Sequence, residues 1–183
     1  MPIQIVILNG GSSSGKSSIA RALQSLLPAP WLTFGVDDFV DALPPAMLNS
    51  EDGLQISQDG HISVGPGIRR LREAWERGIA ATAHAGAGVI IDDVFLAGAA
   101  AQDRWRVALR HLQILWVGVR CEPSVAAQRE ARRADRMTGM AALQAELVHA
   151  DVAYDLEIDS TSASPETCAR QIVDRIANAA VAR

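Results

Sequence analysis

Lysine is almost absent from this sequence of 183 residues. Arginine supplies all but one of its seventeen basic residues, and the single lysine is Lys16. Lysine offers a compact point charge where arginine offers a planar fork, so a lone lysine marks a position that needs the compact charge. A net charge of -4 excludes the broad basic surface with which proteins bind nucleic acids or anionic membranes. Any anion bound by this chain therefore needs a local site.

Cysteines and long apolar segments are also scarce. Cys121 and Cys168 are the only thiols, and their spacing fits neither a disulfide framework nor a zinc site, which indicates free thiols in a reducing compartment. The first apolar run ends at Leu8 and has no basic segment before it, so it is too short for a signal peptide or a membrane span. We therefore expect a cytoplasmic protein that has neither a membrane nor a nucleic acid as partner.

Short apolar segments alternate with helix-length patterns along the chain. Hydrophobic residues make up 49% of the sequence, enough for the core of one compact domain, which we expect to span residues 1–183. The expected strands are residues 3–8, 31–36, 88–94, 112–119 and 153–158. The expected helices are residues 16–27, 67–85, 99–112, 123–134, 138–149 and 165–182. This alternation predicts an α/β fold, with helices on both faces of a parallel sheet. Residues 54–64 depart from it, because two short arms flank Asp59-Gly60, and this pattern predicts a hairpin over the ligand-binding edge.

A glycine- and serine-rich motif follows the first expected strand. It reads GGSSSGKS and matches the GxxxxGK[ST] pattern of a P-loop, with a buried strand before it and a helix after it. Its backbone N–H groups are expected to surround a phosphate at the positive end of a helix dipole. Lys16 would bridge the β- and γ-phosphates of ATP, and the Ser17 hydroxyl would bind Mg²⁺. The expected nucleotide-binding residues are Gly10, Gly11, Ser12, Ser13, Ser14, Gly15, Lys16 and Ser17.

Pairs of acidic residues follow two of the expected strands. Asp92 and Asp93 end the strand at 88–94, where P-loop proteins place a carboxylate beside the magnesium ion. Side chains alternate along a strand, so only one of the two can face the nucleotide, and we favour Asp92. Both could instead be solvated residues at a strand end.

Asp37 and Asp38 follow the strand at 31–36. A kinase that acts on an alcohol needs a group that orients the hydroxyl and accepts its proton, and a carboxylate at this edge is suited to that role. The spacing does not distinguish Asp37 from Asp38, and Asp41 is a third candidate. Whichever of the pair is not the base would have a structural role, such as capping a helix.

Four arginines lie at helical spacing near residue 130: Arg129, Arg132, Arg133 and Arg136. This spacing puts them on one face of a helix, where like charges repel unless an anion meets them. We interpret the segment at about 121–139 as a lid over the ATP phosphates, with Arg133 and Arg136 nearest a hinge at Thr138-Gly139. The alternative is a solvated face balanced by acids elsewhere.

The apolar residues near the acidic pairs are either pocket or core. They are Trp31, Phe34, Phe39, Met47, Phe95 and Leu96, and the sequence does not decide between the two environments. The remaining tryptophans, Trp75, Trp105 and Trp116, are expected in the core. His149, near the end of a helix, is expected to cap that helix or to be solvated, and the alternative is a contact with a ligand.

Taken together, these segments resemble the chloramphenicol phosphotransferase family. The likeness lies in residues 7–18, 30–39, 90–106, 115–122 and 154–159 and extends almost from end to end. The resemblance implies a five-stranded parallel sheet of the nucleoside-monophosphate-kinase type with a lid, ATP as donor, and a catalytic aspartate in the FGVD segment, which falls on Asp37. The family usually has a small polar residue next, whereas this chain has Asp38, and the added charge bears on the choice of acceptor.

We therefore expect transfer of the γ-phosphoryl group of MgATP to a hydroxyl group of a small molecule. The expected acceptor is the primary 3-hydroxyl of chloramphenicol or of an analogue, which would inactivate the antibiotic. Lys16, Asp37, Arg133 and Arg136 would be catalytic, and Ser17 and Asp92 would hold Mg²⁺. The alternatives are a kinase for another hydroxylated metabolite or a sugar, and a module that binds a nucleotide without transferring phosphate.

Overall fold

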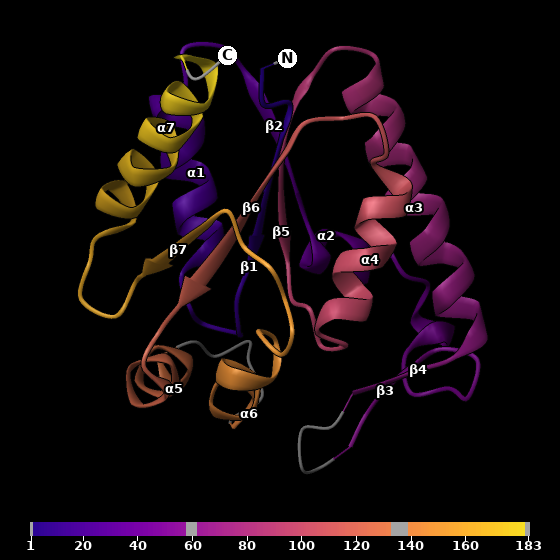
Figure 1. Cartoon of the computed structure of the whole chain (residues 1–183). Coiled ribbons are helices and arrows are strands. Elements are labelled where there is room, and N and C mark those ends of the chain that lie inside the picture. Colours follow the sequence, from indigo (N-terminus) through magenta and orange to yellow (C-terminus); the bar gives the residue numbers. More distant parts are fainter. Residues whose placement is uncertain (1, 58–61, 133–138, 182–183) are drawn as a thin grey trace.

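The computed structural model describes residues 2–57, 62–132 and 139–181. A parallel sheet of five strands in the order β2-β5-β1-β6-β7 forms its centre (Figure 1). The strands are β1 (Ile5–Asn9), β2 (Trp31–Gly35), β5 (Gly88–Asp93), β6 (Ile114–Arg120) and β7 (Leu156–Asp159). They correspond to the five segments that the sequence predicts as strands, and the number of strands implied by the family resemblance is confirmed.

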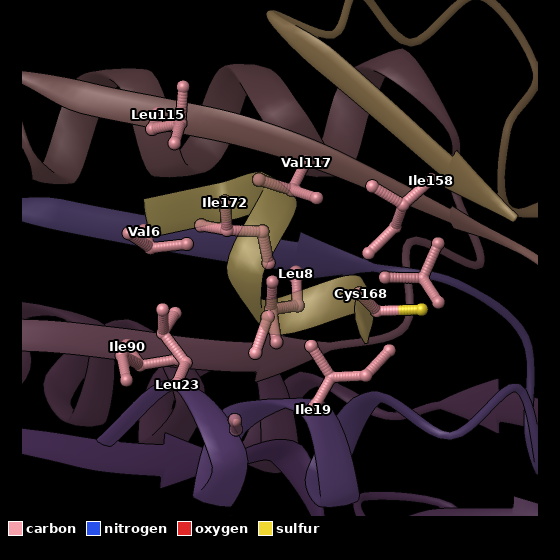
Figure 2. Close-up of a cluster of buried hydrophobic side chains, with 13 residues drawn as sticks. Val6, Leu8, Ile19, Leu23, Ile90, Leu115, Val117, Ile158, Cys168 and Ile172 are labelled. Atoms are coloured by element: carbon pink, nitrogen blue, oxygen red, sulfur yellow. The ribbon is translucent and has the colours of Figure 1, made fainter. Parts of the chain in front are cut away.

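Helices cover both faces of the sheet. On one face lie α1 (Lys16–Leu26) and α7 (Pro165–Val181), and on the other lie α3 (Pro66–His84) and α4 (Ala99–Ala108) (Figure 1). Because side chains alternate along a strand, β1 contributes to two cores. Val6 and Leu8 pack in the first core (Figure 2) and Ile5 and Ile7 in the second. The first core also includes Ile19, Leu23, Ile158, Cys168 and Ile172.

The remaining elements gather at the carboxyl edge of the sheet. They are α2 (Val36–Asp41), the 3₁₀ helix η1 (Pro45–Met47), the antiparallel pair β3 (Leu54–Ile56) and β4 (Ile62–Val64), α5 (Pro123–Ala131) and α6 (Met140–Leu147). In Figure 1, α5 and α6 lie below the end of β6, whereas the hairpin lies below α3. The hairpin predicted from Asp59-Gly60 is thus present, although residues 58–61 lie outside the described ranges.

Several boundaries differ from the sequence prediction; for example, α4 ends at Ala108 rather than at residue 112, and β7 begins at Leu156 rather than at residue 153. The second strand ends at Gly35 rather than at residue 36, and a short helix that was not predicted, α2, begins at Val36. The Gly35 N–H donates to the Asp38 carboxylate at 2.7 Å, and this cap favours helix over strand. Helix α5 ends at Ala131, earlier than predicted, and α6 begins at Met140. Within the described residues, none of the helices combines the length and the hydrophobicity that crossing a bilayer requires.

Candidate active site

The loop between β1 and α1 has the conformation of a phosphate-binding loop. Gly15 has φ = 92°, in the left-handed region that costs a side-chain-bearing residue energy, and it is the N-cap of α1. At Gly10, an added Cβ would lie only 2.6 Å from the carbonyl oxygen of Val119. Glycine at these two positions therefore lets the loop pass close to β6 and turn directly into α1.

The single lysine is buried within this loop. Lys16 is 6% exposed, and its Nζ donates to the carbonyl oxygen of Gly11 at 3.0 Å. The same Nζ lies 3.7 Å from Asp92 Oδ1. A buried ammonium held by one carbonyl and one carboxylate keeps N–H donor capacity for a phosphate oxygen. Lys16 therefore lies beside the loop backbone and Asp92, and its contact with the phosphates of ATP stays a prediction.

The two predicted magnesium ligands are in contact. The Ser17 hydroxyl donates to Asp92 Oδ2 at 2.6 Å, and Asp92 is 9% exposed. Mg²⁺ takes oxygen ligands and is usually held by one or two carboxylates together with substrate phosphates and water. No cluster of three or more His, Cys, Asp or Glu side chains suited to a metal occurs in the described ranges. The oxygen pair of Ser17 and Asp92 fits an ion that shares its shell with phosphates.

Two buried hydroxyl groups in the loop also fit a bound anion. Ser13 Oγ and Ser14 Oγ are the only buried side-chain nitrogen or oxygen atoms without a hydrogen-bond partner in the part of the chain that the structure describes. Ser13 also has φ = 58°, an uncommon conformation for a residue with a side chain. A buried hydroxyl without a partner costs free energy. Phosphate oxygens would satisfy these donors, so the loop is suited to a nucleotide.

Asp93 faces away from the loop, on the side of α3 and α4. It is fully buried, and its carboxylate accepts hydrogen bonds from Arg72 Nη2 at 2.9 Å and from Trp105 Nε1 at 2.7 Å. The backbone N–H of Val94 donates to the same carboxylate. Because side chains alternate along β5, Asp92 lies beside Ser17. Asp93 instead accepts hydrogen bonds from one side chain of α3, Arg72, and one of α4, Trp105.

Arg72 joins Asp93 to a cluster of charges that no sequence pattern predicts. Its Nε donates to Glu76 Oε1 at 3.1 Å, and Arg104 Nε lies 3.7 Å from the same oxygen. Burial opposes the charge of Arg72, but the attraction of Asp93 and Glu76 outweighs it and holds the pKa of Arg72 above its usual value. Burial also raises the pKa of Glu76, against the attraction of both arginines, while burial and repulsion by Arg72 lower the pKa of Arg104.

Helix α2 carries all three candidates for the catalytic base, Asp37, Asp38 and Asp41. Gly35 pairs in register with Asp92, so Asp37 follows only two residues after the point where β2 lies beside the Ser17–Asp92 pair. Asp37 is exposed in the first turn of α2, and the carboxylate of Asp38 is used to cap the N–H of Gly35. The cap gives Asp38 the structural role that we expected for one of the two. The assignment of Asp37 as base stays a prediction.

The arginine pattern is only partly within the described residues. Arg129 Nη2 donates to the carbonyl oxygens of Ser160 at 2.7 Å and Thr161 at 3.2 Å, so its charge is met by the chain after β7. Arg132 is the exposed C-cap of α5. Arg133 and Arg136, the two predicted catalytic arginines, lie outside the described residues.

Helix α6 packs directly against the phosphate-binding loop. The Ser12 N–H donates to Gln144 Oε1 at 2.9 Å. Glu130 of α5 in turn accepts from the N–H groups of Gly139 at 2.7 Å and Ala141 at 2.9 Å, at the start of α6. Neither Gln144 nor Glu130 was predicted. A chain of hydrogen bonds thus connects α5, α6 and the loop.

His149 is buried, so its predicted role as a solvated or capping residue is wrong. Its Nδ1 lies 2.6 Å from the Tyr154 hydroxyl, which accepts from Asn9 Nδ2 at 2.6 Å. Burial lowers the pKa of His149 to about 4, helped by the charges of Arg120 and Lys16. Burial likewise raises the pKa of Tyr154 to about 12. Asn9 is the last residue of β1, so this network lies at the start of the loop.

Most of the apolar pocket candidates are core residues. Phe39 and Phe95 are buried, and Trp31 packs on the first core at the opposite end of the sheet, where its ring faces Gly88 at the start of β5. Trp105 is fully buried, as predicted. The two thiols are also free as predicted, with Cys168 buried in the first core.

Solved structures with this fold include several kinases. A sugar kinase from a Janibacter species matches with a TM-score of 0.67 at 19% identity, over 96% of this chain and 95% of that one. The Mycobacterium tuberculosis APS kinase in complex with AMPPNP and APS matches with a TM-score of 0.64 at 16% identity, over 96% of this chain and 98% of that one. At this level of identity the likeness shows the fold alone, which is that of the P-loop kinases.

Sequence comparison is more specific. A Mycobacterium tuberculosis protein named "Putative O-phosphotransferase" is 33% identical over 184 aligned residues, which cover 92% of this chain and 80% of that protein. The family model for chloramphenicol phosphotransferase-like proteins matches residues 3–177. These residues include the loop, both acidic pairs and the charge cluster around Arg72, and the chain belongs to the chloramphenicol phosphotransferase-like family.

Proposed function

We propose that this protein transfers the γ-phosphoryl group of ATP to a hydroxyl group of a small molecule. The observation that carries the proposal is the contact between Ser17 and Asp92 at 2.6 Å, with Lys16 3.7 Å from the same carboxylate. A loop that binds a simple anion has no need of a buried carboxylate beside its hydroxyl and its ammonium. A site for MgATP needs all three groups.

The reaction would proceed by in-line displacement. Lys16 and the loop amides hold the β- and γ-phosphates, and Ser17 and Asp92 would hold Mg²⁺, which when bound neutralises phosphate charge. Asp37 orients the acceptor hydroxyl and accepts its proton. The acceptor oxygen bonds to the γ-phosphorus as the bond from that phosphorus to the β,γ-bridging oxygen breaks. The products are the phosphorylated acceptor and ADP.

A lid over the phosphates is part of the proposal. It would comprise residues at about 121–139, and Arg133 and Arg136 would stabilise the charge that spreads over the transferred group. The sequence pattern supports the two arginines. The hydrogen bonds that the Ser12 N–H donates to α6, and that the start of α6 donates to Glu130, support a mechanical connection between this segment and the loop.

Chloramphenicol or an analogue, phosphorylated on its primary 3-hydroxyl, is the proposed acceptor. Membership of the chloramphenicol phosphotransferase-like family supports it. The second candidate is another hydroxylated metabolite or a sugar, and the similarity in fold to a sugar kinase favours that candidate.

Transfer of label from [γ-³²P]ATP tests the proposal. The assay should use chloramphenicol and a panel of hydroxylated metabolites and sugars. Asp37→Asn should retain ATP affinity but lose transfer by several orders of magnitude, about 10³-fold or more, because no base remains. Lys16→Ala should weaken both ATP binding and transfer. Asp103→Asn, which changes an exposed acid on α4, is the matched control and should transfer normally.

Four results would count against parts of the proposal. ATP binding without transfer to any acceptor would indicate a nucleotide-binding module. Full turnover by Asp37→Asn would remove Asp37 from the mechanism, and loss of turnover in Asp41→Asn alone would move the base to Asp41. Unchanged kinetics in Lys16→Ala would contradict the assignment of the phosphate-binding loop.

A further inference from the structure

Arg72 is the part of the buried charge cluster that reaches the surface. The side chain of Asp93 is fully buried and that of Glu76 is 3% exposed, whereas that of Arg72 is 20% exposed. The guanidinium therefore covers the two carboxylates and separates them from solvent.

One nitrogen of the Arg72 guanidinium donates no hydrogen bond to the described residues. Nε donates to Glu76 and Nη2 donates to both oxygens of Asp93, while Nη1 makes no hydrogen bond with any residue in the described ranges. Nη1 is not among the buried atoms that lack a partner, so solvent reaches it. A guanidinium has five N–H donors in a fixed plane. The two acids thus orient Arg72 and leave the N–H groups of Nη1 for a ligand.

The position of Arg72 is at the acceptor side of the proposed site. Its partner Asp93 directly follows Asp92 on β5, and the register partner of Asp92 is Gly35, which leads into α2 and Asp37. Helix α2 is held against α3 because the rings of Phe39 and Trp75 pack with centroids 5.5 Å apart. Arg72 lies one turn before Trp75 on α3, and it contacts Asp93, the last residue of β5, at the carboxyl edge of the sheet.

The cluster as a whole carries no excess charge. Arg72 and Arg104 are balanced by Asp93 and Glu76, so an anionic ligand would meet carboxylates as well as guanidinium groups. Donors without net positive potential suit an uncharged oxygen, such as a carbonyl, nitro or hydroxyl oxygen. A phosphate or carboxylate would instead be better held by arginines that lack acidic partners.

We propose that Arg72 is a specificity-determining residue of the acceptor site, where Nη1 donates hydrogen bonds to an oxygen of an uncharged acceptor. The inference rests on the proposed phosphotransfer. The inference restricts the acceptor to uncharged molecules. It also assigns the choice of acceptor to Arg72, a side chain that takes no part in binding ATP.

Arg72→Lys tests this inference, because lysine keeps the charge that Asp93 and Glu76 require but cannot present the same fork of donors. With chloramphenicol as acceptor, KM for the acceptor should rise about tenfold or more, as expected for a lost charge-assisted hydrogen bond. KM for ATP should stay unchanged, and kcat should change less than about threefold. Calorimetry should show that the affinity for chloramphenicol falls by the same factor as the acceptor KM rises. Arg104→Lys, in the same cluster, should leave the acceptor KM unchanged. Gluconate, an anionic acceptor, should be a poorer substrate of the wild type.

An unchanged acceptor KM in Arg72→Lys, with an active wild type, would overturn the inference and leave the proposed function standing. Equal increases in KM for the acceptor and for ATP would also overturn it, because they would indicate a structural role. A wild type that prefers gluconate to chloramphenicol would contradict the uncharged class of acceptor. If the wild type transfers phosphate to no acceptor of the panel, the proposed function fails, and the inference fails with it.

Discussion

Asp92 and Asp93 are neighbours in the chain and have opposite surroundings. Asp92 faces the loop, where Ser17 and Lys16 contact its two oxygens, and Asp93 is enclosed between the sheet and two helices, where it balances Arg72. In Asp92→Asn, the Lys16 ammonium keeps the carbonyl oxygen of Gly11 as a partner, and the amide oxygen of the new side chain can still accept a hydrogen bond. In Asp93→Asn, the mostly buried Arg72 guanidinium keeps Glu76 but loses the carboxylate that balances the second charge of the cluster. Asp92 should therefore contribute to the binding of MgATP, and Asp93 to the stability of the fold.

Substituting each in turn should separate these roles. Asp93→Asn should lower the free energy of unfolding by about 2–4 kcal/mol, measured by urea denaturation. Asp92→Asn should unfold within about 1 kcal/mol of the wild type but lose most of the magnesium dependence of its ATP affinity, measured by calorimetry. If Asp92→Asn proves the less stable of the two, the assignment of the two faces is wrong.

The side chains of the loop could be predicted because they form one contiguous motif. Asp92 followed from the two-residue alternation of a strand, and the structure brings it to Ser17. Arg72 and Glu76 could not be predicted, because an arginine and a glutamate four residues apart on a helix are typical of an exposed pair. Their importance depends on Asp93, which is distant in the chain and reaches them only through the fold.

Helix α6 depends on a cap supplied by another helix. Glu130 of α5 accepts from the N–H groups of Gly139 and Ala141, which α6 cannot satisfy internally. A carboxylate at this position also interacts favourably with the helix dipole. Since α6 provides Gln144 to the loop, the cap stabilises the segment that holds the Ser12 N–H.

Glu130→Gln should loosen this segment without unfolding the protein. The amide keeps the size of the side chain but loses the charge and one acceptor oxygen, which should cost about 1–2 kcal/mol. Hydrogen exchange should become faster at residues 140–147 and stay unchanged in β1. Glu146→Gln, an exposed change within α6, is the control. Equal protection of α6 in both variants would show that the cap is unimportant.

Caps of this kind explain where the prediction of helices and strands was incomplete. The apolar runs predicted all five strands. Val36 was assigned to a strand but begins α2, because a hydrophobic pattern does not reveal the cap that Asp38 provides. The start of α6 was misplaced for a similar reason, because the carboxylate of Glu130 accepts hydrogen bonds from the N–H groups of Gly139 and Ala141 there.

The network of Asn9, Tyr154 and His149 makes the stability of the whole molecule depend on pH. A neutral His149 can accept a hydrogen bond from the Tyr154 hydroxyl, which in turn accepts from Asn9 at the end of β1. The pKa of His149 is about 4 in the folded protein, below the ordinary value of 6.5. The folded state therefore binds this proton less readily than the unfolded chain. Its contribution to stability is complete above pH 6.5 and is lost as the pH falls toward 4.

This dependence should appear as a loss of about 2 kcal/mol in the free energy of unfolding between pH 7 and pH 5, measured by urea denaturation at each pH. His149→Asn should flatten the profile over this interval, because the amide oxygen can replace Nδ1 as acceptor and does not titrate. His84→Asn, at an exposed position in the last turn of α3, should keep the wild-type profile. If His149→Asn instead follows the wild type down to pH 5, protonation of His149 is not the cause, and the carboxylates of the charge cluster become the groups to test.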